Sequence, residues 1–351
     1  MDRKKVVFVG MSGGVDSSVS AALLKEQGYD VVGVFMKTWS PEWLPCTWPE
    51  ERRDAMRVAA VLDIPLLTFD FEKEYKEGVI DYMITEYKAG RTPNPDVMCN
   101  REIKFGAFLK KALSMGADYV ATGHYARVQL STTNYQLQTS LDRNKDQTYF
   151  LWTVGQEELS HTLFPIGHLQ KSEVRALASK YGLPVAEKKD SQGLCFVGHV
   201  DMKDFLARYI DVAPGAVVDL EGKVIGGHDG AALYTIGERH GFTITKKSPS
   251  ELPYYVVAKD HEKNEITVSH DPLGEAAKDM VTVEKFHTIS GRAPALDKKY
   301  QARLRYRQPL EACTLLSETE VCFDRPQKAI TPGQSLVLYE GDVCVGGGII
   351  A

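Results

Sequence analysis

The stretch that decides the fold is Val7-Phe8-Val9-Gly10-Met11-Ser12-Gly13-Gly14-Val15-Asp16-Ser17-Ser18. An apolar β-branched run leads into two adjacent glycines and then into a helical pattern over 17–27 that Gly28 closes. Adjacent glycines let the backbone turn close to a ligand, and the first turn of a helix presents unpaired N–H groups at its positive dipole end. We therefore expect a strand, a phosphate-binding loop and a helix. A glycine-rich turn without a ligand is the alternative.

Outward from this loop, short β-branched runs alternate with helical patterns, which is typical of an α/β fold with a doubly wound parallel sheet. The pattern predicts strands over 6–9, 31–36, 66–71 and 118–121, and helices over 17–27, 52–62, 100–115, 172–181 and 201–210, with Ser172 as an N-cap. After residue 211, glycine-punctuated short runs predict a small mixed domain. Clearer alternation then predicts a C-terminal β barrel with strands over 281–286, 300–306, 312–316, 321–323, 336–339 and 343–350. The expected domains are 1–210, 211–280 and 281–351.

The composition is that of an ordinary globular protein. The chain has 351 residues, of which 43% are hydrophobic and 25% charged, and its net charge is −5, so it has no global basic field. The longest apolar run, 31–36, is far shorter than the roughly 18 residues that suggest a membrane span, and the N-terminus does not read as a signal peptide. We therefore expect no membrane association and a cytoplasmic location. Six scattered cysteines without a C-x-x-C pair, and histidines without ligand spacing, predict neither a disulfide framework nor a metal site.

The loop is neither a Walker A motif nor a Rossmann fingerprint. S-G-G-x-D-S after an N-terminal strand resembles the loop of the ATP pyrophosphatases, which bind ATP and release pyrophosphate on transferring AMP to an oxygen. The loop does not name the nucleophile that displaces AMP, which is nitrogen in the amide synthetases and sulfur in the tRNA thiolases. The resemblance implies ATP, with Mg²⁺, contacted by Gly10, Met11, Ser12, Gly13, Gly14, Val15, Asp16, Ser17, Met36 and Gly123.

Two cysteines stand in settings that favour reactivity. Cys99 directly precedes the predicted helix over 100–115, where the dipole favours a thiolate. Cys195 lies in a polar loop between two predicted helices, with Lys188 and Lys189 nearby to lower its pKa. Either cysteine, taken alone, could be a buried core residue without a chemical role. The cysteines at 46, 313, 322 and 344 lie in strand-like or Trp-flanked surroundings, and we interpret them as structural.

Six motifs follow one another along the chain: N-P-D-x-x-C-N (94–100), A-T-G-H-Y (121–125), K-D-Q-x-Y-F-L (145–151), F-P-I-G (164–167), D-S-Q-G-L-C-F (190–196) and G-H-x-G-x-x-x-Y-T-I-G (227–237). Together with Arg305-Tyr306 and Pro332-Gly333-Gln334-Ser335, they resemble the family of bacterial tRNA-specific 2-thiouridylases over nearly the full length. Every catalytic motif of that family is present.

The resemblance implies a reaction on the wobble uridine of the tRNAs for Glu, Gln and Lys, whose 2-oxygen is adenylated by ATP and then replaced by sulfur. Cys195 would receive a persulfide from a sulfur-relay carrier protein or a cysteine desulfurase. Cys99 would complete the transfer by attacking that persulfide, which leaves a Cys99–Cys195 disulfide. Asp96 would act as a general base or position the base. Asn94, Pro95 and Asp96 would contact the target base, and the implied tRNA contacts are His124, Lys145, Asp146, Gln147, Arg305, Tyr306 and Gln334.

Some sulfur-inserting relatives hold an iron–sulfur cluster on a C-x-x-C pair. Asp96 occupies the first position of that pair here, so we expect no cluster, although ligation by three cysteines stays open.

Two segments are basic despite the net charge. Residues 88–111 carry six Lys or Arg against two acids, and residues 292–307 carry six against Asp297, with Tyr300 and Tyr306 interleaved. Arg303, Arg305 and Arg307 alternate and would share one face of a strand, which suits an RNA backbone. A solvated face is the ordinary alternative. His124 follows a predicted strand at the carboxyl edge of the sheet, where ligands bind, or else it is a structural histidine.

Two other function classes stay open at this point: an ATP-pyrophosphatase amide synthetase, and a non-catalytic tRNA- or nucleotide-binding module. The absence of a glutaminase domain and the settings of Cys99 and Cys195 speak against the amide synthetase.

Overall fold

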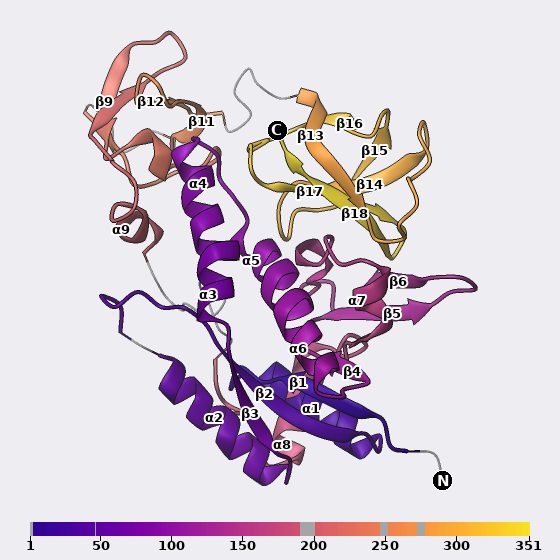
Figure 1. Cartoon of the computed structure of the whole chain (residues 1–351). Coiled ribbons are helices and arrows are strands. Elements are labelled where there is room, and N and C mark those ends of the chain that lie inside the picture. The colour runs from indigo at the N-terminus through magenta and orange to yellow at the C-terminus, as the bar shows by residue number, and fades with distance from the viewer. Residues whose placement is uncertain (1–2, 46, 190–200, 246–251, 272–277) are drawn as a thin grey trace.

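The computed structural model describes residues 3–45, 47–189, 201–245, 252–271 and 278–351. In these ranges the strands form three sheets, which Figure 1 shows as a lower α/β body, an upper β module next to α4 and a barrel at the C-terminus. The α/β class with a parallel sheet, a small central domain and a C-terminal barrel is thereby confirmed.

The first sheet is parallel and carries the N-terminal loop. Its strand order is β3-β2-β1-β4-β7, with β1 (Val6–Gly10), β2 (Asp30–Lys37), β3 (Leu66–Asp70), β4 (Tyr119–Ala121) and β7 (Thr162–Leu163). Val7 and Val9 pack with α1 (Val15–Glu26), α2 (Trp48–Val61) and α8 (Lys171–Lys180), whereas Phe8 packs on the opposite side. Both faces are therefore buried, which explains why β1 is apolar throughout.

The opposite face is covered by two helical runs that the sequence analysis captured only in part. One consists of α3 (Glu72–Tyr75), the π-helical η1 (Lys76–Asp81) and α4 (Tyr82–Lys88), and it was not predicted. The other consists of α5 (Pro95–Met98), the π-helical η2 (Cys99–Phe108) and α6 (Leu109–Ser114). The second run begins at Pro95, five residues before the predicted start, because Asn94 caps it and proline suits the first helical position.

Two later helices, α8 and α9, also differ from expectation. Ser172 is not the N-cap of α8. The N-cap is Gln170, whose backbone amide donates to Glu173 Oε2 at 2.7 Å. The helix predicted over 201–210 is the short α9 (Met202–Leu206), capped by Asp201. The remaining helical turns are η3 (Thr148–Phe150), α7 (Gln156–Ser160) and η4 (Ala231–Leu233).

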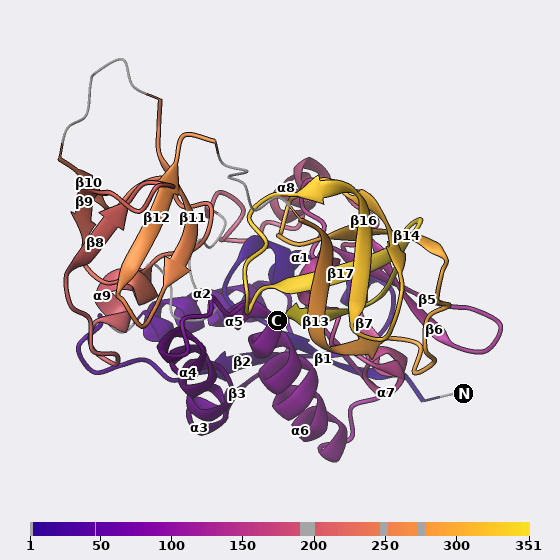
Figure 2. The same cartoon turned by 90° about the horizontal axis from the view of Figure 1, so that it is seen from above.

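The second sheet forms the central domain. Its order is β10-β9-β8-β12-β11, with β8 (Gly215–Val218), β9 (Val224–His228), β10 (Thr243–Ile244), β11 (Tyr255–Asp260) and β12 (Glu265–Ser269). The buried side chains of Val217, Val256 and Ile266 join the core that also holds Met83 of α4. The central domain therefore packs continuously with the long helical run, as Figures 1 and 2 show.

The third sheet closes into a barrel. In the described part of the chain its strands are β13 (Lys278–Thr288), β14 (Lys299–Arg303), β15 (Glu311–Leu315), β16 (Glu320–Gln327), β17 (Ser335–Glu340) and β18 (Val343–Ile350), and β13 pairs with both β16 and β18. An unpredicted hairpin, β5 (Ala126–Leu130) and β6 (Tyr135–Thr139), continues this sheet because β6 pairs with β18. The N-terminal domain thus shares a sheet with the barrel. No helix in the described ranges has the length and apolar character needed to cross a membrane.

Candidate active site

The N-terminal loop has the tight geometry that its glycines predicted. Gly13 adopts φ +70°, and a Cβ there would lie 2.4 Å from the carbonyl oxygen of Glu51 on α2, so both conformation and space require glycine. Ser17 Oγ accepts from the Ser12 amide at 3.3 Å and donates to the Gly14 carbonyl at 3.2 Å, and Ser18 Oγ donates to the same carbonyl at 2.7 Å. These bonds hold the loop in one shape ahead of α1.

The expected neighbours of the loop lie against it. A Cβ on Gly123, just past β4, would sit 2.6 Å from the amide nitrogen of Ser17. A Cβ on Gly10 would sit 2.9 Å from Met36 Cε, at the end of β2. The carboxyl ends of β1, β2 and β4 therefore meet at one edge, which is where open α/β sheets bind ligands.

Two lysines that the sequence analysis did not assign to the loop reach it from far along the chain. Lys171 Nζ lies 2.7 Å from Asp16 Oδ1, which also accepts from the Tyr125 hydroxyl at 3.0 Å. Lys188 Nζ donates to the Gly13 carbonyl at 3.1 Å and to Asp54 Oδ2 at 2.8 Å. No local pattern marks these lysines, because they lie 155 and 175 residues from their loop partners.

This loop suits a polyphosphate. Lys171 and Lys188 supply positive charge, and the start of α1 supplies amide N–H groups. Burial raises the pKa of Glu51 beside Gly13, an effect that the charge of Lys188 opposes. No three His, Cys, Asp or Glu side chains in the described ranges are grouped to hold a metal ion.

The predicted base-binding segment enters the second helical run. Asn94 Oδ1 accepts from the Val97 amide at 3.3 Å, and Asp96 occupies the second helical position with its side chain partly exposed. Cys99 lies a turn further on, inside the helix rather than before it, and is fully buried. Cys195 lies outside the described residues, so the structure places one of the two predicted thiols.

Asn100, next to Cys99, carries an unexpected polar feature. Its amide donates to the Phe150 carbonyl at 3.0 Å, while its buried Oδ1 has no hydrogen-bond partner in the described part of the chain.

The tRNA contacts that the resemblance implies over 145–147 fall into two groups. Lys145 is partly exposed. Asp146 is buried and accepts from Thr148 Oγ1 at 2.9 Å and the Ser140 amide at 3.1 Å, and burial raises the pKa of its carboxyl group. Gln147 Oε1 accepts from the Tyr125 amide at 2.9 Å. Asp146 and Gln147 therefore use side-chain oxygens to shape the loop that presents Lys145.

His124 is buried at the end of β4. Its Nδ1 lies 2.7 Å from Thr122 Oγ1 and its Nε2 lies 3.3 Å from Lys104 Nζ. Burial, and to a lesser extent the charge of Lys104, lowers the pKa of His124 well below its usual value. The imidazole is thus held neutral inside the protein.

The expectation that three arginines share a strand face is wrong. β14 ends at Arg303, and Arg305 and Arg307 lie in the turn that follows, where Arg307 has φ +64°. The turn directs them differently: Arg305 bonds inside the protein to Thr331 Oγ1 and the Ile236 carbonyl, whereas Arg307 is exposed. The centroid of the Tyr306 ring lies 4.5 Å from the centroid of the Phe150 ring.

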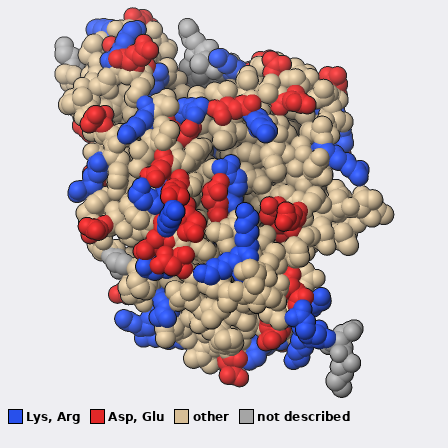
Figure 3. Space-filling model, in the orientation of Figure 1, with Lys and Arg blue, Asp and Glu red and all other residues tan. Residues whose placement is uncertain are grey.

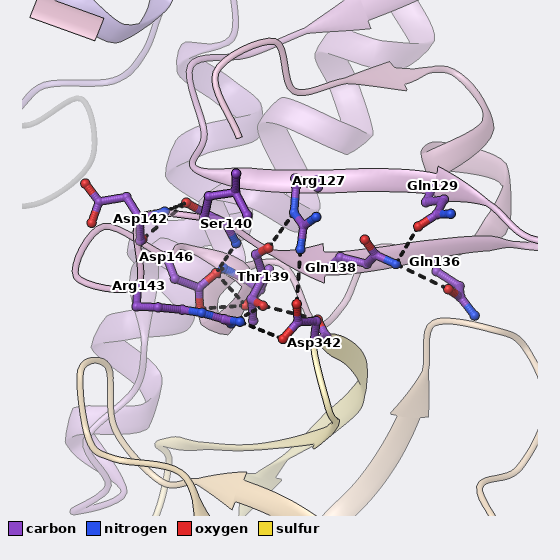
Figure 4. A network of polar contacts seen from close by, with 12 residues as sticks. Arg127, Gln129, Gln136, Gln138, Thr139, Ser140, Asp142, Arg143, Asp146 and Asp342 are labelled. Carbon is purple, nitrogen blue, oxygen red and sulfur yellow. Dashed lines mark hydrogen bonds and ion pairs between the residues drawn. The ribbon is translucent and has the colours of Figure 1, made fainter. Parts of the chain in front are cut away.

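A basic cavity separates the Lys145 loop from the barrel. It has a volume of about 750 Å³ and is lined by Arg143, Asn144, Lys145, Gln301, Arg303, Arg307, Gln308, Pro309, Leu310, Gly341 and Asp342. Figure 4 shows Arg127 and Arg143 both pointing to Asp342, at 3.3 and 2.6 Å, so one rim of the cavity ties the hairpin region to the barrel. On the face seen in Figure 3, basic side chains are interspersed with acidic ones.

Three family models match the chain in succession: the tRNA methyl transferase HUP domain over residues 5–199, the tRNA methyl transferase PRC-barrel domain over 203–270 and the aminomethyltransferase beta-barrel domain over 278–350. Among solved structures, the U34-tRNA thiolase NcsA from Methanococcus maripaludis with its [4Fe-4S] cluster has a TM-score of 0.37 and 18% identity over 59% of this chain and 64% of that chain. This likeness is too low to carry an argument.

Curated relatives match nearly the whole chain. It is 50% identical over 354 residues to the tRNA-specific 2-thiouridylase MnmA of Geobacillus thermodenitrificans, covering 98% of this chain and 94% of that protein. The MnmA of Halalkalibacterium halodurans is 50% identical over 353 residues with the same coverage, and that of Streptococcus thermophilus is 48% identical over 358 residues, covering 99% and 95%. At this identity and coverage, the chain belongs to the family of tRNA-specific 2-thiouridylases, the sulfurtransferase family that its motifs predicted.

Proposed function

We propose that this protein is an ATP-dependent tRNA 2-thiouridylase that acts on the wobble uridine. One observation carries the proposal: a chain of this family assembles a hydrogen-bonded glycine loop, flanked by Lys171 and Lys188, at the carboxyl edge of a parallel sheet. The residues that would hold ATP are the loop over 10–17, Met36 and Gly123. Asp16 is the carboxylate within the loop that could serve as an oxygen ligand for Mg²⁺.

In the first step the 2-oxygen of uracil attacks the α-phosphorus of ATP. An O–P bond forms, the bond to the β-phosphate oxygen breaks, and pyrophosphate leaves. Lys171 and Lys188 would stabilise the charge on the phosphate oxygens. Asp96, partly exposed near the start of the second helical run, would accept a proton from uracil or position the base beside Asn94 and Pro95.

In the second step the terminal sulfur of a Cys195 persulfide attacks the activated C2 carbon, and AMP leaves with the former 2-oxygen. Cys99 then attacks the Cys195 sulfur, which breaks the bond to the transferred atom and forms a Cys99–Cys195 disulfide. A thiol reductant resets the pair. Adenylation turns the 2-oxygen from a poor leaving group into a good one, and a persulfide is a strong nucleophile at neutral pH. Both effects favour substitution at the C2 carbon.

The two thiols must approach each other in this scheme, since a disulfide needs Cα atoms within about 7 Å. Cys99 is fully buried in the structure. We therefore expect motion of a segment bearing one of the cysteines between the resting and tRNA-bound states. An unchanged Cys99–Cys195 separation in structures with and without tRNA would contradict this.

The proposed partners are the tRNAs for Glu, Gln and Lys and a persulfide donor, either a sulfur-relay carrier protein or a cysteine desulfurase. Lys145 and Tyr306 are partly exposed, and we expect both to touch RNA. His124, Asp146 and Gln147 would act mainly by shaping the surface, because their side chains bond within the protein. We expect no iron–sulfur cluster, since Asp96 occupies the first position of the C-x-x-C pair that holds one in other sulfur-inserting enzymes.

The test is to incubate the protein with ATP, Mg²⁺, a persulfide source and unmodified tRNA, and to measure 2-thiouridine by mass spectrometry. We expect product from the wild type and none from Cys99→Ser or Cys195→Ser, with AMP and pyrophosphate formed in proportion to product. A wild type that consumes ATP only when ammonia or an amino acid is added would instead indicate an amide synthetase. Binding of tRNA without turnover would indicate a non-catalytic module.

A further inference from the structure

The barrel reaches across to the segment that precedes Asp96. Gln334 Nε2 donates to the carbonyl oxygens of Thr92 and Pro93, at 3.0 and 3.1 Å. The Thr92 amide in turn donates to the Pro332 carbonyl at 2.9 Å. Thr92 and Pro93 are both buried, so the three bonds satisfy polar backbone groups that water does not reach.

The barrel segment that makes these bonds, 331–335, is itself fixed. The Gly333 amide donates to the Ile350 carbonyl at 2.9 Å, and the Ile350 amide donates to the Gln334 carbonyl at 2.8 Å. Gly333 has φ +90°, and a Cβ there would lie within 3.0 Å of three backbone atoms of Thr92. The two backbones are thus in direct contact, and the side chain of Gln334 is held at one place relative to the last strand, β18.

Arg305 links the same segment to the central domain. Its Nη2 donates to Thr331 Oγ1 at 2.8 Å and to the Ile236 carbonyl. Tyr149, from the N-terminal domain, adds a third link, because its hydroxyl lies 2.9 Å from the Ser335 carbonyl oxygen and 3.1 Å from the Leu304 carbonyl oxygen. All three domains therefore meet around residues 331–335.

We propose that Gln334 and Arg305 are positioning residues: they tie the barrel and central domain to the segment over 92–94 and so set the place of Asp96 at the start of its helix. The resemblance implied direct tRNA contacts for both. In the structure the Gln334 amide and one Arg305 guanidinium nitrogen donate to protein acceptors. The effect on turnover rests on the proposed function, whereas the effect on the segment does not.

Two variants separate positioning from contact. Gln334→Met keeps the length of the side chain and its lack of charge but removes both N–H donors. Arg305→Lys keeps the positive charge that an RNA phosphate would feel but loses the guanidinium fork. Gln129→Met, on the exposed face of the β5–β6 hairpin, is a matched control for the first variant, and Lys145→Ala serves as the contact-type comparison.

Three quantities are measured on the full-length protein: the dissociation constant for tRNA, the single-turnover rate of 2-thiouridine formation at saturating tRNA, and hydrogen–deuterium exchange of peptides spanning 92–99. For Gln334→Met we expect tRNA affinity within about twofold of wild type, a rate lower by about tenfold or more, and exchange at the Thr92 amide faster by a similar factor. Arg305→Lys should change the same quantities in the same direction by less. Gln129→Met should match wild type.

The proposal is overturned if either variant weakens tRNA binding as Lys145→Ala does while the rate at saturating tRNA stays at the wild-type value. It is also overturned if exchange over 92–99 does not change in Gln334→Met. If the wild type forms no 2-thiouridine, the proposed function fails, and the exchange measurement alone then decides whether these residues position the segment. A Gln334→Met protein that does not fold leaves Arg305→Lys to decide the question by the same three measurements.

Discussion

At the scale of the residue, Lys171 shows how positive charge is brought to the glycine loop over 10–17. Its ammonium group lies 2.7 Å from Asp16, and its side chain is only 14% exposed. A partly buried cation beside the glycine turn can move its hydrogen bonds to phosphate oxygens when ATP binds, because the surroundings screen it less than bulk water does.

We expect Lys171→Met to weaken ATP binding by about ten- to a hundredfold, which corresponds to the roughly 1.5–3 kcal/mol of a hydrogen bond to a charged group. Isothermal titration calorimetry with ATP and Mg²⁺ measures this. Lys180→Met is the matched control, because Lys180 carries the same charge at the other end of α8 and is exposed. Equal affinities for the two variants would show that Lys171 does not contact ATP.

His124 gives a residue-scale prediction about pH. Its pKa in the folded protein lies well below 6.5, so the unfolded chain takes up a proton near pH 6.5 that the folded protein still excludes. Stability should therefore fall as the pH drops below about 6.5, by up to about 1.4 kcal/mol per pH unit for this one group, and stay level above it.

The measurement is the thermal midpoint between pH 5 and pH 7.5. We expect His124→Gln to have a lower midpoint at pH 7.5 but a flatter decline toward pH 5 than the wild type. His168→Gln, which replaces an exposed histidine, should keep the wild-type slope. If all three proteins lose stability in parallel, His124 is not the group that excludes the proton.

At the scale of the element, the end of β4 and the start of α1 approach each other so closely that only a glycine fits between them. A Cβ on Gly123 would lie 2.6 Å from Ser17 N and 2.8 Å from Asp16 C, and neither backbone atom can move without shifting the loop. We expect Gly123→Ala to displace the start of α1, to weaken ATP binding by about tenfold or more, and to destabilise the protein by about 1–3 kcal/mol.

Calorimetric titration with ATP and a thermal melt give the two numbers for Gly123→Ala. Gly227→Ala is a suitable control, because the added methyl group would meet its nearest atom, the Gly215 carbonyl oxygen, at an ordinary 3.6 Å. Wild-type ATP affinity in Gly123→Ala would mean that the loop does not depend on this close approach.

The elements also show what the sequence could and could not predict. The strands β1–β4 and the six barrel strands were recognisable, because each buries at least one face and so carries a local apolar pattern. The β5–β6 hairpin was missed because its partner, β18, lies some 200 residues away. Long separations of 155 and 175 residues likewise hide Lys171 and Lys188, whereas the loop that they contact is local and was found.

The arginine alternation failed for a different reason. Arg303, Arg305 and Arg307 have the spacing of a strand, but the chain turns after Arg303, and a period of two says nothing about where a strand stops. Gln334 and Arg305 were recognised through their motifs as important residues. Their partners, Thr92, Pro93 and Ile236, could be named only once the three domains were seen together.

At the scale of the whole molecule, a chain with net charge −5 must bind a polyanion through a local basic surface. The cavity between the Lys145 loop and the barrel is such a surface, because Arg143, Lys145, Arg303 and Arg307 line it against Asp342. Arg307 lies on the barrel turn, lines this cavity and is exposed. It is therefore a better probe of RNA contact than Arg305, whose guanidinium group bonds inside the protein.

Each phosphate that a basic side chain neutralises releases condensed counterions, so the logarithm of the binding constant falls linearly with the logarithm of salt concentration. We expect Arg307→Ala to weaken tRNA binding and to reduce the magnitude of this slope by about 0.7 to 0.9, the share of one phosphate contact, with ATP affinity unchanged. Fluorescence anisotropy with labelled tRNA over a range of salt concentrations gives the slope. Lys73→Ala, which removes a charge from the exposed side of α3, should leave both slope and affinity as in the wild type. If Arg307→Ala and Lys73→Ala gave the same slope, the tRNA backbone would have to follow another path across the molecule, away from the barrel turn.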